Sequence, residues 1–178
     1  MDHDSYPDSY IAGILQEAKS FALVGASANT VRPSYFVLKY LLAKGYRVFP
    51  INPGLAGGEI LGQKVFANLA AVEEPVDVVD IFRNSEAALG VVREALAVNE
   101  RLGIKFIWMQ LGVRNDAAAR LAEEAGLKVV MNRCPKIEYG RLSGEIAWVG
   151  VNNRMISSRK PLILGQGYQQ LSIRKDKP

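Results

Sequence analysis

The chain has 178 residues, of which 49% are hydrophobic and 22% charged, as in an ordinary globular protein, and we expect a single domain over residues 1–178. Its formal net charge of +4 equals that of residues 157–178 alone, so the body is neutral and lacks the basic face of a nucleic-acid-binding domain. No apolar run approaches the ~20 residues of a membrane-spanning helix, and the acidic start is unlike a signal peptide. We therefore expect a cytoplasmic protein with no nucleic-acid or membrane partner.

An N-terminal helix is expected at about residues 9–19, ahead of five short strands. The strands are nearly continuous in apolar residues, which is typical of a parallel sheet covered on both faces. They are "FALVG" (21–25), "YRVFPI" (46–51), "VDVVDIF" (76–82), "IKFIWMQL" (104–111) and "LKVVM" (127–131). After Lys136 the signals weaken: "EIAWVGVNN" can be a further strand or an irregular cover, and residues 157–178 read as an irregular basic tail.

Helical patterns with ordinary start and stop signals separate these strands. Pro33 suits a first helical position, Asn84 or Ser85 can cap the next helix, and Asn115 can cap the one after it. A glycine that can adopt the closing left-handed conformation follows each of these helices: Gly45, Gly103 and Gly126. Alternating strands and helices predict an α/β fold, a Rossmann-like doubly wound parallel sheet of about five strands with helices on both faces.

In open α/β sheets, ligands bind beyond the carboxyl ends of the strands, where the strand order reverses. The first strand normally flanks that point, and a helix N-terminus attracts phosphate there. The candidate phosphate loop therefore contains Gly25, Ala26, Ser27, Asn29, Arg32, Pro33 and Ser34. The alternative is structural: Gly25 makes only a tight turn and Ser27 a local loop bond.

The residues after the second strand bear on which nucleotide binds. NAD enzymes place an acidic residue there to accept hydrogen bonds from the ribose hydroxyls. This chain has Asn52, Pro53 and Gly54 instead, and "GASANT" has one glycine where the dinucleotide fingerprint has three. These differences count against NAD and leave NADP or coenzyme A (CoA) open.

Five motifs carry a family resemblance: "LVGAS…RPSY", "GYRVFPINPG…GGEILGQKVF", "EPVDVVDIFR", "WMQLGV" and "AGLKVVMNRCPKIEY". In order and spacing they resemble the small stand-alone CoA-binding proteins, the YccU-like group of bacteria and archaea. These proteins are similar to the CoA-binding domain of the succinyl-CoA synthetase α subunit. The resemblance covers about residues 20–139 and implies a Rossmann-like domain with CoA lying across the loops after the strands.

The same resemblance implies a role for each loop. The CoA diphosphate would lie near Gly25, Ala26 and Ser27, and Asn52, Pro53 and Gly54 would border the adenosine. Phe82 and Arg83 would flank the nucleotide, with the forked guanidinium of Arg83 suited to a phosphate. The pantetheine path would be lined by Gln110, Leu111, Gly112, Asn132, Arg133, Cys134 and Pro135.

Ligase chemistry is not expected. The synthetase uses a phosphorylated histidine from a second domain, whereas the only histidine here, His3, lies in a polar N-terminus and is expected to be solvated. Cys134 reads as a small buried residue, with a reactive thiol that pairs with CoA as the alternative. Asp80 is expected to cap or pair within the fold, and Trp108 to be a core or cover residue.

These features predict a non-catalytic protein that binds CoA or an acyl-CoA, with a protein partner or homo-oligomer unspecified. One alternative is an NADP-dependent oxidoreductase in which Arg32 or Arg83 accepts the 2′-phosphate, although no catalytic pair can be placed. "YFVLK", Tyr35 to Lys39, has Tyr–Lys spacing but lies in the wrong helix for that chemistry. The other is a regulatory interaction module that has lost its nucleotide.

Overall fold

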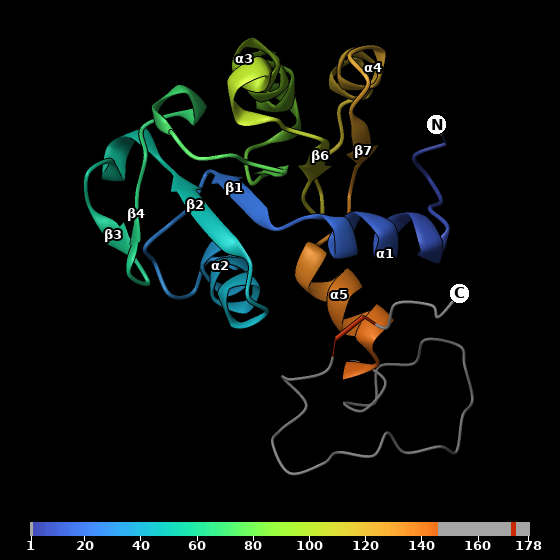
Figure 1. Ribbon diagram of the computed structural model, residues 1–178, viewed down its shortest axis with the longest axis horizontal. Coiled ribbons are helices and arrows are strands. Elements are labelled where there is room, and N and C mark those ends of the chain that lie inside the picture. Colours follow the sequence, from blue (N-terminus) through green and yellow to red (C-terminus); the bar gives the residue numbers. More distant parts are fainter. Residues whose placement is uncertain (1, 146–171, 174–178) are drawn as a thin grey trace.

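The computed structural model describes residues 2–145 and 172–173 and contains a five-stranded parallel sheet (Figure 1). The strands lie in the order β2-β1-β5-β6-β7, so the order reverses between β1 and β5. All neighbouring strands in this sheet pair in parallel. Their bounds are β1 Ser20–Val24, β2 Arg47–Ile51, β5 Val78–Ile81, β6 Phe106–Met109 and β7 Lys128–Val130. The predicted Rossmann-like α/β fold is confirmed.

Five α-helices cover the two faces of the sheet. They are α1 Asp8–Glu17, α2 Pro33–Ala43, α3 Ser85–Leu102, α4 Asp116–Glu124 and α5 Pro135–Ser143. Figure 1 shows α3 and α4 on one side of the sheet and α1, α2 and α5 on the other. Two buried apolar clusters correspond to these faces: one includes Val92 of α3 and Ala122 of α4, and the other includes Ile14 of α1 and Leu38 of α2.

The start and stop signals act as the sequence indicates. The side-chain oxygen of Asn84 accepts a hydrogen bond from Ala87 N–H, and that of Asn115 accepts one from Ala118 N–H. Pro33 occupies the first turn of α2. The glycines that follow α2, α3 and α4 have positive φ angles: 85° at Gly45, 70° at Gly103 and 84° at Gly126.

A small hairpin, helix α5 and two short 3-10 helices, Pro53–Leu55 and Leu69–Ala71, were not predicted. The hairpin, β3 Glu59–Ile60 and β4 Gln63–Lys64, is antiparallel and follows β2, and Leu61 in its turn has a φ of 51°. Helix α5 begins where the sequence signals weaken. Residues 146–153 of the possible late strand lie outside the described residues, as does the basic tail apart from Ser172 and Ile173. Among the described helices, none is long and apolar enough to cross a membrane.

Candidate functional site

The point where the strand order reverses is built from the ends of β1 and β5. Gly25 follows β1 with a φ of 96°, and Phe82 N–H donates to Val24 O across the two strands at 2.8 Å. A Cβ placed on Gly25 would lie 3.1 Å from Phe82 O and 3.2 Å from Arg83 Cδ. Both the left-handed backbone and the close approach require glycine here. The sequence-predicted residues Gly25, Phe82 and Arg83 are therefore brought together.

Asn52 joins the first loop to the second. Its Nδ2 donates to Ala26 O at 2.7 Å, and its Oδ1 accepts from Gly54 N–H at 2.9 Å. Gly25 N–H donates to Ile51 O at 3.0 Å beside it. Both polar groups of the Asn52 amide are thus engaged inside the protein. This residue shapes the loop edge on the β2 side, and the exposed Pro53 and Gly54 form the surface there.

The loop between β1 and α2 is organised by its own side chains. Ser27 Oγ accepts from Asn29 N–H at 3.1 Å, and Asn29 Oδ1 accepts from Val31 N–H at 3.1 Å. These local bonds match the structural alternative for Ser27. Ala26 and Ser34 are buried, whereas Ser27 keeps partial exposure and Asn29 is exposed.

The helix starts differ between the two faces of the sheet. On one face, α3 and α4 are capped by Asn84 and Asn115. On the other face, α2 and α5 begin with Pro33 and Pro135 and have no side-chain cap. Uncapped first turns leave backbone N–H groups without intrahelical partners and carry the positive end of the helix dipole. Anion-binding potential is therefore concentrated on the face that holds α2 and α5.

Two exposed arginines flank the first of these helix starts. Arg32 directly precedes α2, and the Arg83 side chain lies against Gly25. Within residues 2–145, neither guanidinium forms an ion pair, in contrast to Arg47, which lies 2.8 Å from Glu74. Both cations are therefore left without a carboxylate partner among residues 2–145 at this edge of the sheet.

A buried polar pair supports the loop after β6. Asp80 is fully buried, and Gln110 Nε2 donates to its two carboxylate oxygens at 3.0 and 3.1 Å. Burial raises the pKa of Asp80 well above its usual value, and the Gln110 hydrogen bond opposes this only in part. Asp80 thus pairs within the fold, as predicted, but its partner was not predicted.

The loops after β6 and β7 are tied to each other. Gly112 N–H donates to Asn132 Oδ1 at 2.8 Å, and Asn132 N–H donates to Val113 O at 3.1 Å. Asn132 has a φ of 53°, a conformation that Asn tolerates better than most residues. Three of the residues expected along the pantetheine path, Gln110, Gly112 and Asn132, therefore belong to one connected edge, with Leu111 exposed on it.

Arg133 and Cys134 are oriented differently from each other. The Arg133 guanidinium donates to Asp4 O at 3.3 Å and lies over the Tyr6 ring, so it is turned toward the N-terminal segment. Cys134 is buried, and burial raises the pKa of its thiol, with the nearby Asp80 carboxylate adding to the shift. The expectation of a small buried cysteine is confirmed, and a thiolate is disfavoured at neutral pH. Pro135 is also buried.

The expectation for His3 was wrong. Its side chain is only 8% exposed, with Nδ1 2.8 Å from Tyr6 Oη and Nε2 3.4 Å from Glu123. The segment before α1 packs onto the fold because Tyr6 Oη also accepts from Met131 N–H at 2.8 Å. Trp108 is fully buried, as predicted, and donates to Arg133 O.

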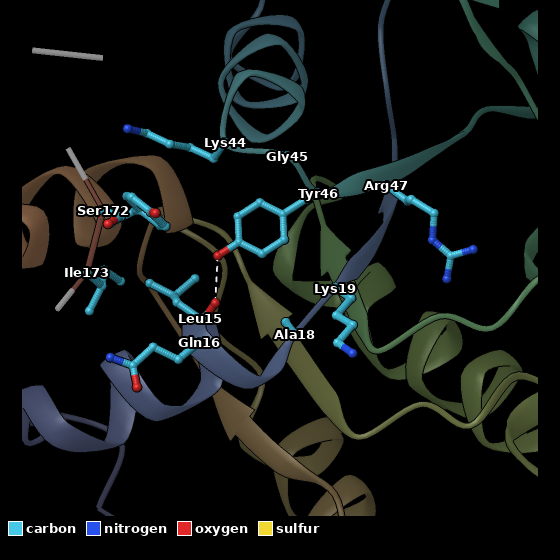
Figure 2. A pocket seen from close by; sticks show the side chains of 11 residues that line it. Leu15, Gln16, Ala18, Lys19, Lys44, Gly45, Tyr46, Arg47, Ser172 and Ile173 are labelled. Atoms are coloured by element: carbon cyan, nitrogen blue, oxygen red, sulfur yellow. Dashed lines mark hydrogen bonds between the residues drawn. The ribbon is translucent and has the colours of Figure 1, made fainter. Parts of the chain in front are cut away.

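A cavity of about 690 Å³ lies at the opposite edge of the sheet, by the amino ends of β1 and β2 (Figure 2). Tyr46 donates across it to Leu15 O at 2.6 Å. Two of its three basic lining residues are paired, Lys44 with Glu145 and Arg47 with Glu74, and the third is Lys19. The strand-order reversal, the uncapped helices and the arginines Arg32 and Arg83 all lie at the other edge, which remains the candidate site. No group of three or more potential metal-ligating side chains occurs among the described residues.

Comparison with known proteins assigns the chain to a family. A CoA binding domain model matches residues 19–140. The uncharacterized protein YneT of Bacillus subtilis (strain 168) is 35% identical over 129 residues, which cover 72% of this chain and 91% of that protein.

Solved structures agree with this match. Cell-free ID.343 from Thermus thermophilus is 36% identical with a TM-score of 0.71, over 76% of this chain and 98% of that one. A hypothetical protein from Pyrococcus horikoshii OT3 is 37% identical with a TM-score of 0.72, over 78% and 94%. The dinucleotide forming acetyl-coenzyme A synthetase 1 of Ca. Korarchaeum cryptofilum is 27% identical with a TM-score of 0.53, over 64% of this chain and 26% of that one. The resemblance expected from the five motifs is confirmed, and the chain belongs to the CoA-binding domain family.

Proposed function

We propose that this protein binds CoA or an acyl-CoA across the loops after its strands and does not itself catalyse a reaction. The observation that carries the proposal is the contrast between the helix starts. The two Asn-capped helices, α3 and α4, lie on one face, and the three helices without a side-chain cap, α1, α2 and α5, lie on the other; of these three, α2 and α5 follow strands of the sheet. A diphosphate at the α2 start would receive backbone N–H groups and the favourable end of the helix dipole.

Arg32 and Arg83 strengthen this assignment. Both are exposed: Arg83 lies against Gly25, where the backbone can approach a diphosphate closely, and Arg32 directly precedes α2, while CoA carries a further phosphate on its ribose. The neutral, internally bonded Asn52 at the end of β2 places no carboxylate against that phosphate. This arrangement supports a phosphorylated ribose on the β2 side.

The non-catalytic part of the proposal rests on the nucleophiles and bases near the site. The raised pKa of Cys134 keeps its thiol protonated at neutral pH. The imidazole of His3 is held between Tyr6 and Glu123. Asp80, in β5, is fully buried and accepts hydrogen bonds from Gln110. None of these three groups is presented to a ligand on the loop edge.

Calorimetric titration of ligand-stripped protein with CoA, acetyl-CoA and NADPH tests the proposal. We expect micromolar binding of both CoA ligands and none of NADPH. Arg83→Ala should weaken CoA binding about tenfold or more, because a hydrogen bond to a charged group contributes about 1.5–3 kcal/mol. Arg93→Ala, at an exposed position in α3, is the matched control and should bind normally.

If only NADPH binds, the CoA proposal is replaced by the NADP-dependent oxidoreductase. If none of the three ligands binds, the result favours a module that has lost its nucleotide. Acetyl-CoA incubated with the protein should release no free thiol above the buffer rate. Release of thiol that depends on the protein would contradict the non-catalytic assignment.

A further inference from the structure

We propose that this protein prefers CoA thioesters with an acyl chain of several carbons, and that the chain lies on an apolar seat formed by Val31, Phe36, Leu111 and Ile137. This inference rests on the proposed function and names the ligand class of the same site. The seat joins the loop before α2, the first turns of α2 and α5, and the loop after β6.

The exposed hydrophobic surface is unevenly distributed. Six large hydrophobic side chains are exposed among the described residues, and all six lie in segments that follow the carboxyl ends of strands. The four of the seat are exposed by 74% at Val31, 49% at Phe36, 62% at Leu111 and 45% at Ile137. Exposed apolar side chains gathered at one edge indicate a surface that is covered in the functional state.

Contacts join the elements that carry Phe36, Ile137 and Leu111, and Val31 lies two residues before α2. Helices α2 and α5 pack together, and the ammonium of Lys136, the neighbour of Ile137, lies 6.0 Å from the centre of the Phe36 ring. On the other side, Gly112 beside Leu111 is bonded to Asn132 in the loop that leads into α5. The seat therefore bridges the helix starts on the α2 and α5 face.

The direction in which an extended CoA molecule crosses the loop edge would bring its acyl end to this seat. In doubly wound sheets the adenosine lies toward the second strand and the diphosphate at the loop after the first. Here these places are the β2 edge and the loop at Gly25, so the rest of an extended CoA molecule has to continue over β5 and β6 toward β7. Helix α5 begins after β7, so the thioester end arrives beside Leu111 and Ile137.

An acyl chain fits this surface better than a polar group does. Each fully buried methylene contributes about 0.8 kcal/mol, which is about fourfold in affinity. A bare thiol or an acetyl group would leave most of the seat in water. A chain of eight carbons is long enough to cover several of the four side chains.

The test compares CoA, acetyl-CoA and octanoyl-CoA by calorimetry on the ligand-stripped protein. We expect octanoyl-CoA to bind at least about tenfold more tightly than CoA, a gain well below the fourfold-per-methylene limit. The double variant Phe36→Ser/Ile137→Ser should lose that gain and keep its affinity for CoA. Val31→Ser, in an exposed loop, provides a second variant that does not disturb a helix. Leu61→Asn, an exposed apolar position in the β3–β4 turn, is the matched control and should retain the gain.

The possible outcomes distinguish a failure of this inference from a failure of the proposed CoA binding. If CoA itself fails to bind, the proposed function is wrong. If CoA binds and octanoyl-CoA gains nothing, or if the seat variants keep the gain, the acyl seat is overturned while CoA binding stands. If light scattering shows a dimer that the seat variants dissociate, and no acyl gain is found, the surface is an interface between copies and the inference is likewise overturned.

Discussion

Gly25 and Phe82 approach so closely that a Cβ on residue 25 would lie 3.1 Å from the Phe82 carbonyl oxygen. Gly25 also has a φ of 96°, which side-chain-bearing residues rarely adopt. The ends of β1 and β5 can therefore meet only with glycine at this position.

Gly25→Ala should lower the free energy of unfolding by about 1–3 kcal/mol, because both the backbone conformation and the contact become strained. CoA affinity should fall with it, since the proposed diphosphate site lies at this turn. Urea denaturation measures the first effect and calorimetry the second. Gly90→Ala is the control: it lies within α3 with no atom near the new Cβ, so it should raise stability by about 0.5–1 kcal/mol. Equal effects at both positions would contradict the assigned strain.

Asn52→Ala should loosen two loops at once. It removes the hydrogen bonds to Ala26 O and from Gly54 N–H, so we expect a loss of about 1–2 kcal/mol in the free energy of unfolding and weaker CoA binding. Asn68→Ala removes only the cap of the 3-10 helix Leu69–Ala71. It should therefore lower stability without changing CoA affinity, and a binding defect in that variant would show that general destabilisation accounts for both results.

Asp80→Asn should change how stability depends on pH. The raised pKa of Asp80 keeps its proton in the folded state above pH ~4, where the unfolded chain has released it, so the wild-type free energy of unfolding falls as pH rises. Asn keeps an acceptor for Gln110 and cannot ionise. The free energy of unfolding of the variant, measured relative to wild type in parallel denaturation curves, should therefore increase steadily from pH 4 to 7.

Asp77→Asn should change the pH dependence of stability in the opposite direction. Burial alone would raise the pKa of Asp77, but hydrogen bonds from Lys19 N–H, Lys105 and Ser20 outweigh it, and the pKa is lowered. That stabilisation is present above pH ~4 and is lost as pH falls through the lower folded-state pKa. The variant should be less stable than wild type at pH 7 and approach it in acid, so the same trend in both variants would contradict the two assignments.

Cys134 should react slowly with thiol reagents. Burial raises its pKa, so iodoacetamide at pH 7.5 should alkylate the folded protein at least about tenfold more slowly than the urea-unfolded chain. Intact-mass analysis over time measures both rates. Rapid labelling of the folded protein would mean that the thiol is exposed and activated, and would support the alternative of a reactive thiol that pairs with CoA.

The five strands of the sheet could be predicted because each is a short apolar run bounded by a helix-ending glycine or a polar loop. The loop at Gly25 was likewise evident from its position after β1. Its close contact with Phe82 could not be predicted, because that contact depends on β5 pairing with β1 between residues that are 57 positions apart in the sequence.

Helix α5 was missed for a definable reason. Its buried positions include Glu138 and Gly140, so its sequence lacks a regular apolar stripe. Glu138 is accommodated by Arg141, 2.7 Å away on the next turn. The β3–β4 hairpin has strands of two residues each, too short for any periodicity. Gln110 as the partner of Asp80 is a tertiary pairing that neither residue's neighbours indicate.

The missing caps on α2 and α5 have a consequence for the lifetime of the protein. Neither helix start has a side-chain cap, so on the proposed function a bound phosphate group would take the place of a cap and complete the hydrogen bonding of the first turn. A ligand that binds only the folded state raises its stability in proportion to the logarithm of ligand concentration. The ligand-free chain would then open more often and be degraded sooner, so the supply of the proposed ligand in the cell would set how much of the protein persists.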